Sequence, residues 1–272
     1  MIKPGEIQKK ARAGGVRDQQ IEKDYILSWI LQGIAMHEEL SKVLAFKGGT
    51  VLKKIFFEDY RFSEDLDFTL VRNDVSNQQI LDYFIEVFEN IKEEANIPLE
   101  IIDIDEIQEE QGKGSGLNFY ISYVGPLGGM GTHKRVKVDI SRTEKLQFRP
   151  VLKNAFLLYT DQEEHQLLSY SLEEILIEKL RSVMQRMQAR DFYDIWYLLE
   201  ECGLDIELLT NEFIAKCKSK NINPLDFFVK LEQRIPQYKA RWQKSLKDQI
   251  PDLPEFDKVE RETMRHLKKL KI

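Results

Sequence analysis

The chain has 272 residues, 42% of them hydrophobic and 32% charged, which is enough to bury the core of one large domain or of two unequal ones. Its formal net charge of −6 argues against a protein that coats nucleic acid by bulk attraction. No apolar run approaches the roughly 20 residues of a membrane span, and residues 1–15 lack the apolar core of a secretory signal, so we expect a cytoplasmic protein without a membrane partner.

The first predicted element is helical and covers residues 5–36. Ile21, Tyr25 and Trp29 recur there at helical spacing and predict an apolar face against a core. The dipeptide Lys23-Asp24 lies on the other side of that face, where a surface ion pair is one interpretation and a functional role is the other.

A glycine turn follows the next apolar run, residues 43–46, which is predicted to be a strand. Gly48, Gly49 and Thr50 stand between this strand and a segment whose apolar residues return at helical spacing. Free backbone N–H groups and the helix dipole favour an anion such as phosphate at that position, and Lys47 adds a cation. We therefore expect Lys47, Gly48, Gly49 and Thr50 to bind a nucleotide.

Two aspartates begin the following strand, predicted at residues 66–70. Side chains alternate along a strand, so Asp65 and Asp67 share one face, together with Ser63, while their neighbours enter the core. Two carboxylates on one face near a phosphate-binding turn suit a hard divalent cation, Mg²⁺ or Mn²⁺, that also binds the oxygens of a triphosphate.

The sequence around these positions closely resembles one family. Lys47-Gly48-Gly49-Thr50, the block from Arg61 to Phe68 and the segment from Ile21 to Tyr25 are similar to the AbiEii-type toxin nucleotidyltransferases of bacterial type IV toxin–antitoxin systems, which belong to the DNA polymerase β-like superfamily. The resemblance implies that Asp65 and Asp67 are catalytic metal ligands. The placement of Ser63 on the same strand face predicts that it contacts the nucleotide. The 14 residues between Thr50 and Asp65 exceed the compact spacing of the wider superfamily.

The alternative interpretation is structural, because a Gly-Gly pair is usually only a turn and an acidic pair usually faces solvent. The chain contains its own comparison in Asp103 and Asp105, a second Asp-x-Asp without a preceding glycine turn and helix. We expect this second pair to lie on the solvent face of a strand at 99–107.

A third acid is predicted on a later strand. After a helix at 78–91, the strand at 99–107 and another at 117–124, alternation predicts a strand at 135–141 whose core face leaves Asp139 outside. The resembled superfamily places a third acid beside the Asp-x-Asp strand, which implies Asp139 as a catalytic metal ligand. An ordinary ion pair with Lys137 is the alternative. The glycine-rich segments 111–116 and 125–131 are predicted to be loops.

The chain becomes helical near residue 170, with Ser171 as a predicted cap and no strand signal beyond it. A break is expected near Gln188-Ala189, and four more helices are predicted at 205–218, 224–234, 236–247 and 257–270. The charge balance changes as well, because residues 1–170 contain 21 Lys and Arg against 28 Asp and Glu, whereas residues 171–272 contain 19 against 18.

The resemblance extends into this tail. Glu178-Lys179-Leu180 and Arg190-Asp191-x-x-Asp194 are similar to later motifs of the same toxins. This implies that Lys179 and Asp191 are catalytic, with Lys179 at the nucleotide phosphates, and that Arg190 binds the nucleotide. The alternatives are a solvated helix face for Lys179 and an ion-pair network with Arg190 for the two aspartates.

We therefore expect an α/β (α+β) nucleotidyltransferase fold, with a mixed sheet flanked by helices, at residues 1–165 and an all-α domain at 166–272. The expected reaction transfers a nucleoside monophosphate from an NTP and releases pyrophosphate, with Mg²⁺ or Mn²⁺. The resemblance implies an RNA acceptor, such as the 3′ end of tRNA, and a cognate antitoxin encoded alongside. A small-molecule or protein acceptor, or a non-catalytic nucleotide-binding protein of the same fold, are the alternatives. The 2 cysteines and 4 histidines match no zinc site or hydrolase triad, and the oligomeric state stays open.

Overall fold

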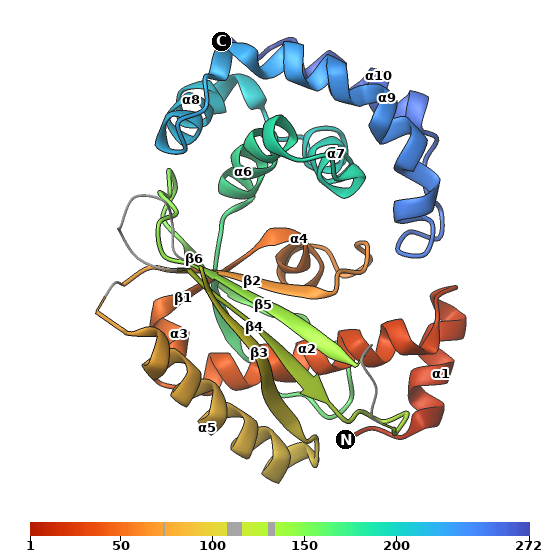
Figure 1. Ribbon diagram of the computed structural model, residues 1–272. Helices are drawn as coiled ribbons and strands as arrows, with labels where there is room; N and C mark the ends of the chain where they lie inside the picture. The colour runs from red at the N-terminus through yellow and green to blue at the C-terminus, as the bar shows by residue number, and fades with distance from the viewer. Residues whose placement is uncertain (73, 108–115, 130–133) are drawn as a thin grey trace. The chain divides into compact units, whose positions relative to one another are not determined.

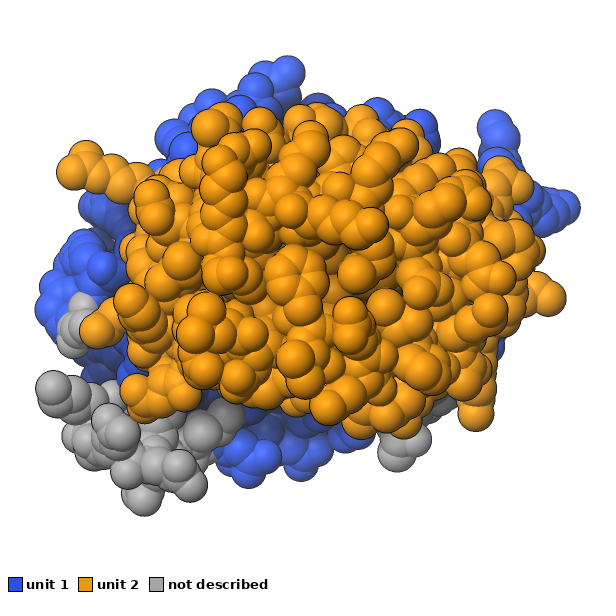
Figure 2. Space-filling model, turned by 90° about the horizontal axis from the view of Figure 1, so that it is seen from above, with its two compact units in different colours: residues 1–144, 150–169 blue, residues 145–149, 170–272 orange. Residues whose placement is uncertain are grey.

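The computed structural model describes residues 1–72, 74–107, 116–129 and 134–272 (Figure 1). The predicted loops at 111–116 and 125–131 thus fall partly outside the described residues. The chain divides into two compact units, residues 1–144 with 150–169 and residues 145–149 with 170–272 (Figure 2). Sequence placed a single boundary after residue 165, whereas these units divide after Ser169 and assign a short earlier segment to the second unit.

The first unit is built on a mixed sheet, which confirms the predicted α/β class. Within the described residues its strands have the order β3-β4-β5-β2-β1-β7-β6. The strands are β1 Leu44–Lys47, β2 Asp65–Leu70, β3 Leu99–Ile107, β4 Gly116–Tyr123, β5 Arg135–Ser141, β6 Val151–Asn154 and β7 Gln166–Ser169. The pairs β2–β5 and β1–β7 are parallel, and the other neighbours are antiparallel. The short strands β6 and β7 were not predicted.

The helices of this unit are α1 Pro4–Ala13, α2 Asp18–Met36, α3 Leu40–Val43, α4 Gly48–Val51 and α5 Asn77–Ala95, and a π-helical turn, Leu52–Phe56, continues α4. Figure 1 shows α3 and α5 on one side of the strands and α4 on the other. The predicted helix at 5–36 is divided in two at Gly14-Gly15, where Gly15 has φ +63°. Phe84 of α5 meets Phe119 of β4 edge to face at 5.1 Å. The sheet and α5 therefore share one aromatic core.

The two faces of the central strands differ in polarity. Leu66, Phe68, Val138 and Ile140 are completely buried on the core face. The residues between them, which include Asp65, Asp67 and Asp139, are only half-buried. The alternation along β2 and β5 thus keeps the carboxylates out of the core, as predicted.

The second unit is helical throughout its described residues. Its α-helices are α6 Leu172–Gln185, α7 Ala189–Trp196, α8 Thr210–Ser219, α9 Phe227–Leu246 and α10 Phe256–Leu267. The predicted helix break near residue 235 is wrong, because α9 is continuous and contains Pro236. Residues on both sides of this proline pack into the core: Leu231, Tyr238 and Trp242 are buried, and Tyr238 stacks on Phe192 at 5.4 Å. This packing keeps the helix intact in spite of the lost backbone N–H.

A buried carboxylate explains why residues 145–149 belong to the second unit. Glu174 accepts hydrogen bonds from the backbone N–H groups of Gln147 and Phe148, both at 2.8 Å. Its other oxygen pairs with the buried Lys216 at 2.8 Å, and this ammonium also donates to the carbonyl of Lys145. The segment is thereby tied at several points to α6 and α8. None of the helices in the described ranges is long and apolar enough to cross a membrane.

Candidate active site

The glycine turn packs directly against the acidic strand. Gly48 has φ +83°, and a Cβ at this residue would overlap the Oδ2 atom of Asp67. A Cβ on Gly49 would overlap the guanidinium of Arg61. Strand pairing sets this arrangement, because Lys47, the last residue of β1, lies opposite Asp67 of β2. Gly48 is therefore required both by its backbone conformation and by the approach of Asp67, whereas a side chain at position 49 would have to displace the end of Arg61.

Thr50 fixes the helix that follows the turn. Its hydroxyl donates to the backbone carbonyl of Asp65 at 2.6 Å, and the residue is 1% exposed. Lys47 is also buried, at 9% exposed, and is the residue before the helix. Both predicted nucleotide contacts therefore lie at the turn, and the described role of Thr50 is to hold the start of α4 against β2.

The structure brings the three predicted carboxylates together on adjacent strands. Asp67 lies opposite Asp139 in the parallel β2–β5 pair, and Asp65 lies opposite Lys137. The Oδ2 atom of Asp139 is 3.5 Å from the Lys137 ammonium. It also accepts from Asn118 of β4 at 3.1 Å, with the amide oriented so that its nitrogen faces the carboxylate. The ion pair with Lys137 is therefore present and Asp139 lies beside Asp67, while its role as a metal ligand stays a prediction.

The carboxylates fit a cation that is shared with a substrate. Nowhere in the described parts of the chain are three or more His, Cys, Asp or Glu residues grouped closely enough to hold a metal ion by themselves. Mg²⁺, however, is usually bound through one or two carboxylates and completed by substrate phosphates and water. Asp65 and Asp67 supply such oxygens on one half-buried face. Ser63 is half-buried and precedes this strand.

The second Asp-x-Asp is exposed, as predicted. Asp103 and Asp105 lie on β3, which β4 and β5 separate from β2. The β3–β4 register shifts between Ile102 and Asp105, and Asp103 has φ +50°. The Asp103 carboxylate is 3.6 Å from Arg135. The two acidic pairs thus differ in surroundings although they share a motif.

Asp24 is a buried anchor and not a surface acid. It is 3% exposed and pairs with the Lys54 ammonium at 2.8 Å, while the hydroxyl of Tyr159 donates to it at 2.8 Å. Lys54, on the π-helical turn after α4, also donates to Ser28 at 2.7 Å. Burial lowers the pKa of Lys54 to about 8 although Asp24 favours the charged form. This network fastens the segment after the glycine turn to α2.

Glu22 fastens a different segment. It is completely buried and pairs with Lys134 at 2.9 Å, and it accepts from the backbone N–H of Leu127 at 2.8 Å. A Cβ on Gly125 would come within 2.7 Å of its carboxylate. Glu22 therefore holds the described part of the connection between β4 and β5, the strand that carries Asp139.

Glu22 and Asp24 belong to a run of four residues, Glu22 to Tyr25, and the other two members, Lys23 and Tyr25, also have partners elsewhere in the first unit. Lys23 pairs with Glu64 at 2.9 Å, directly before Asp65, and the hydroxyl of Tyr25 donates to Asp161 at 2.6 Å. Four consecutive residues of α2 thus each bind a different segment of the first unit. The surface-pair interpretation of Lys23-Asp24 is wrong, since the two residues have separate partners. The sequence signal was a run of four polar residues inside an apolar helix.

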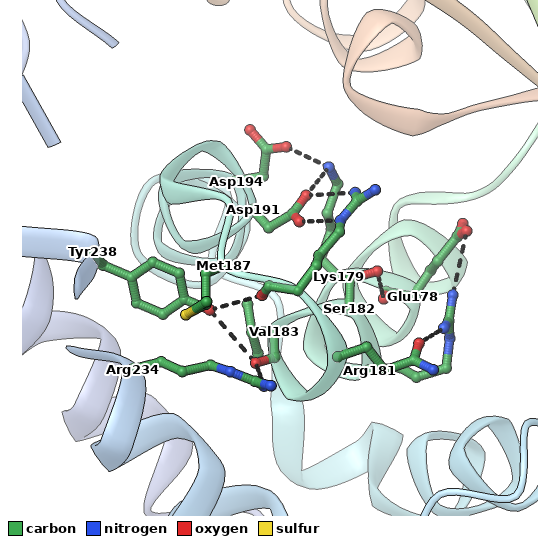
Figure 3. A network of polar contacts seen from close by, with 12 residues as sticks. Glu178, Lys179, Arg181, Ser182, Val183, Met187, Asp191, Asp194, Arg234 and Tyr238 are labelled. Carbon is green, nitrogen blue, oxygen red and sulfur yellow. Dashed lines mark hydrogen bonds and ion pairs between the residues drawn. The ribbon is translucent and has the colours of Figure 1, made fainter. Parts of the chain in front are cut away.

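The second unit contains the other predicted set in a separate ion-pair network (Figure 3). The ammonium of Lys179 lies 2.7 Å from Asp191 and 2.8 Å from Asp194, and both aspartates are completely buried. Lys179 is 6% exposed, so the alternative of a solvated helix face is wrong, while contact with a nucleotide phosphate stays a prediction. Arg190 is half-buried in the first turn of α7.

Arg186 is the member of this network that sequence analysis missed. Its Nε is 2.7 Å from Asp191 Oδ2, and its Nη2 is 3.1 Å from Oδ1 (Figure 3). Burial raises the pKa of Asp191, but the charges of Lys179 and Arg186 outweigh it and keep this pKa below its ordinary value. The Arg186 side chain is 52% exposed, whereas that of Lys179 is 7% exposed. Of these two partners of Asp191, Arg186 is thus the one that solvent reaches. It lies in the loop between α6 and α7, where periodicity gives no signal.

Side chains of α9 hold this loop. Arg234 and Tyr238 both donate to the carbonyl of Val183, and Tyr238 also reaches the carbonyl of Arg186 at 3.3 Å (Figure 3). These bonds satisfy carbonyls that the end of α6 leaves without partners inside the helix. The hydrogen bond from Tyr238 thus holds the backbone of Arg186 in place.

Comparison with known proteins agrees with this geometry. The sequence profile of the nucleotidyl transferase AbiEii toxin family, type IV toxin–antitoxin system, matches residues 29–262. Comparison with curated protein sequences gives no significant match. The fold is similar to JHP933 from Helicobacter pylori, with TM-score 0.57 and 16% identity over 94% of this chain and 93% of that one. It is also similar to MenT4, a nucleotidyltransferase toxin from Mycobacterium tuberculosis, with TM-score 0.51 and 17% identity over 100% of both chains. The chain belongs to the AbiEii nucleotidyl transferase toxin family of type IV toxin–antitoxin systems.

Proposed function

We infer that this nucleotidyltransferase transfers a nucleoside monophosphate from an NTP to a hydroxyl group of an RNA acceptor. The acceptor oxygen forms a bond to the α-phosphorus, the bond from that phosphorus to the β-phosphate oxygen breaks, and pyrophosphate leaves. The hydroxyl proton passes to solvent or to a carboxylate. The observation that carries this proposal is the packing of the Gly48 turn against Asp67, with Asp139 beside it on the next strand.

The first unit would bind the triphosphate. The turn of Lys47, Gly48, Gly49 and Thr50 opens a helix, where backbone N–H groups and the dipole attract phosphate oxygens. Ser63 would contribute a hydroxyl from the segment before the carboxylates.

Asp65, Asp67 and Asp139 are the residues that would hold Mg²⁺ or Mn²⁺. When bound, such a cation neutralises charge on the phosphates and lowers the pKa of the attacking hydroxyl. The three carboxylates are half-buried on the sheet face opposite the core, where this chemistry would take place. The hydrogen bond from Thr50 to the carbonyl of Asp65 keeps the turn and the acidic strand in register.

In the second unit, Arg186 is the best candidate for an anion contact. Its guanidinium is half-exposed, and Asp191 orients it through two hydrogen bonds. Lys179, pinned between Asp191 and Asp194, would hold the acid that orients Arg186 and add positive charge to the same place. Arg190 is the second arginine proposed for the nucleotide.

Membership of the family supports a cognate antitoxin as partner. An RNA acceptor such as the 3′ end of tRNA, and a cytoplasmic location, are part of the proposal. MenT4 is named a nucleotidyltransferase toxin, which supports the reaction class for a protein of this fold.

The test is a transfer assay with each of the four NTPs carrying a label on the α-phosphate. The purified chain is incubated with total RNA, a metabolite extract and a protein extract in separate reactions, with Mg²⁺, with Mn²⁺ and with chelator. We expect labelled RNA together with released pyrophosphate, and no label with chelator. Label only on a small molecule or on protein would contradict the RNA acceptor, and NTP binding without pyrophosphate release would contradict the enzyme.

A further inference from the structure

A cavity in the first unit opens beside the acidic strand and has no part in the proposal above. Its volume is about 470 Å³, and its walls include Arg17, Gln20, Lys23, Glu64 and Tyr123. Ligand sites for small molecules typically have volumes of about 300–1,000 Å³. The cavity is therefore large enough for one nucleotide unit.

The cavity lies at the end of β2 where the carboxylates are. Glu64 lines it and directly precedes Asp65, and consecutive Cα atoms are about 3.8 Å apart. Tyr123, the last residue of β4, forms another wall. Tyr123 belongs to the buried face of β4, whereas Asp65 lies on the other face of the sheet. A strand whose terminal hydroxyl reached Asp65 would therefore have to pass around the end of β2 to bring its preceding nucleotide to this cavity.

Sheet order places the cavity and the glycine turn on opposite sides of β2. The turn follows β1, which is one neighbour of β2, whereas Tyr123 belongs to β4, beyond the other neighbour β5. In phosphoryl transfer the attacking and leaving oxygens lie roughly in line across the phosphorus. If the turn binds the phosphates that leave, the acceptor must approach from the β4–β5 side.

The walls have the chemistry of a nucleotide site. Arg17 and Lys23 supply positive charge at the N-terminal end of α2, where the helix dipole also attracts anions. Glu64, which also lines the cavity, pairs with Lys23 and offsets its charge. Gln20 offers an amide that can donate and accept, and Tyr123, which is 5% exposed, offers a small part of its aromatic ring. Burial, with Glu22 and Glu64, raises the pKa of Tyr123, so its hydroxyl stays protonated and can donate. Cations, amides and an aromatic ring together suit a phosphate and a base.

Ion pairs hold several of the residues that line the cavity. Glu22 is completely buried and Lys134 is 7% exposed, and they pair at 2.9 Å. Lys134 also donates to the carbonyl of Gly128 at 2.5 Å. The Lys23–Glu64 pair at 2.9 Å joins α2 to the residue before Asp65. These pairs fix the positions of charged side chains at the cavity.

We propose that this cavity binds the nucleotide that precedes the reacting end of a single-stranded RNA acceptor. The proposal rests on the RNA-directed transfer proposed above and gives that reaction an acceptor subsite. It assigns to the first residues of α2 a role in selecting the acceptor, separate from binding of the NTP.

The experiment uses the full chain and a short single-stranded RNA with 4-thiouridine next to its 3′-terminal nucleotide. Ultraviolet light should crosslink this base to Tyr123 or to peptides containing residues 17–23, and excess NTP should leave the crosslink in place. Crosslinks confined to other segments would overturn the proposal. Displacement of the RNA by NTP would also overturn it, since the cavity would then hold the donor nucleotide.

A matched pair of surface variants gives the second readout. Arg17→Gln should reduce the slope of log affinity for RNA against log salt by about 0.7, the value for one phosphate contact on a single strand. Arg12→Gln, an exposed arginine of α1 that does not line the cavity, should leave this slope unchanged. Equal slopes for Arg17→Gln and the wild type would contradict the subsite.

The transfer assay separates this proposal from the one on which it rests. Labelled RNA without a crosslink in the cavity would overturn the subsite alone. RNA that crosslinks in the cavity but never receives a nucleotide would support the subsite as an RNA-binding site and contradict the proposed transfer.

Discussion

The carboxylate of Asp67 occupies the space that a side chain on Gly48 would fill. The glycine also has φ +83°, so two independent constraints meet at one residue, and only one of them concerns the acidic strand. A substitution at Gly48 therefore tests whether the position of the Asp67 carboxylate matters for nucleotide transfer.

Gly48→Ala should abolish nucleotide transfer, because the new Cβ must displace the Asp67 carboxylate. The left-handed backbone adds a cost of about 1–2 kcal/mol in the free energy of unfolding. Gly203→Ala is the matched control: it has φ +69° but nothing within 4 Å of its Cβ position. It should lose similar stability and keep its activity. The measurements are thermal unfolding and the transfer assay. Equal activity losses for the two variants would mean that lost stability, and not displacement of Asp67, reduces the activity.

Lys54 should make the stability of the first unit depend on pH above neutrality. Its pKa is lowered to about 8 in the folded chain from an ordinary value of 10.5. Between these values the unfolded chain binds more protons than the folded one, so stability rises with pH. The contribution from Lys54 should grow by about 2 kcal/mol between about pH 7.5 and about pH 10.

Chemical denaturation of the wild type and Lys54→Met across this range measures the effect. The difference in the free energy of unfolding should change in favour of the wild type as the pH rises. Lys9→Met, an exposed lysine of α1, should show a constant difference. A constant difference for Lys54→Met would mean that the buried ammonium does not titrate in this window.

Much of the first unit can be predicted from the sequence because its signals are local. Alternation identifies β2 and β5, and it places Asp65, Asp67 and Asp139 on one face before any tertiary contact is known. The register that sets Asp139 beside Asp67 is a long-range pairing, which alternation does not specify. The short strands β6 and β7 escaped prediction because, with 4 residues each, they are too short for a pattern.

The interactions of α2 and of Arg186 show a second limit. Glu22 and Asp24 are charged residues in a helix, and sequence alone suggests solvent for both. Their partners Lys134 and Lys54 lie far along the chain, so pairing is visible only once the fold brings them together. At Pro236 the sequence predicted a helix break that the structure does not have, because packing of α9 outweighs the helix-breaking effect of the proline.

Asp191→Asn should destabilise the second unit. The substitution leaves Arg186 facing a neutral amide, while Lys179 keeps Asp194 as a carboxylate partner. The cost should therefore stay below the roughly 3–5 kcal/mol of a buried charge left without any partner. The pKa of Asp191 lies below its ordinary value in the folded chain, so its contribution is present at neutral pH and disappears in acid. Denaturation of the variant and the wild type at neutral and at acidic pH measures this, and the difference should shrink as the pH falls. A difference that does not depend on pH would contradict the assigned network.

Arg186→Gln separates binding from stability. The half-exposed guanidinium should contribute to phosphate binding, so the KM for NTP should rise by about 10-fold, equivalent to about 1.4 kcal/mol. The melting temperature should change less than in Asp191→Asn, because the partner Lys179 still neutralises Asp191. Arg261→Gln, a 73% exposed arginine of α10, is the control and should change neither quantity. An unchanged KM for Arg186→Gln would contradict a phosphate contact and leave Arg186 only its ion pair with Asp191.

The most direct test of the catalytic site compares the two Asp-x-Asp motifs of the chain. Asp67→Asn and Asp105→Asn remove one negative charge each, from a half-buried and from an exposed carboxylate respectively. The measurement is the rate of nucleoside monophosphate transfer from labelled NTP by each folded variant. Asp67→Asn should lower the rate by more than about 100-fold, since even residues behind a metal ligand typically contribute 10–100-fold. Asp105→Asn should retain the wild-type rate, and equal rates for the two variants would contradict catalysis at Asp67.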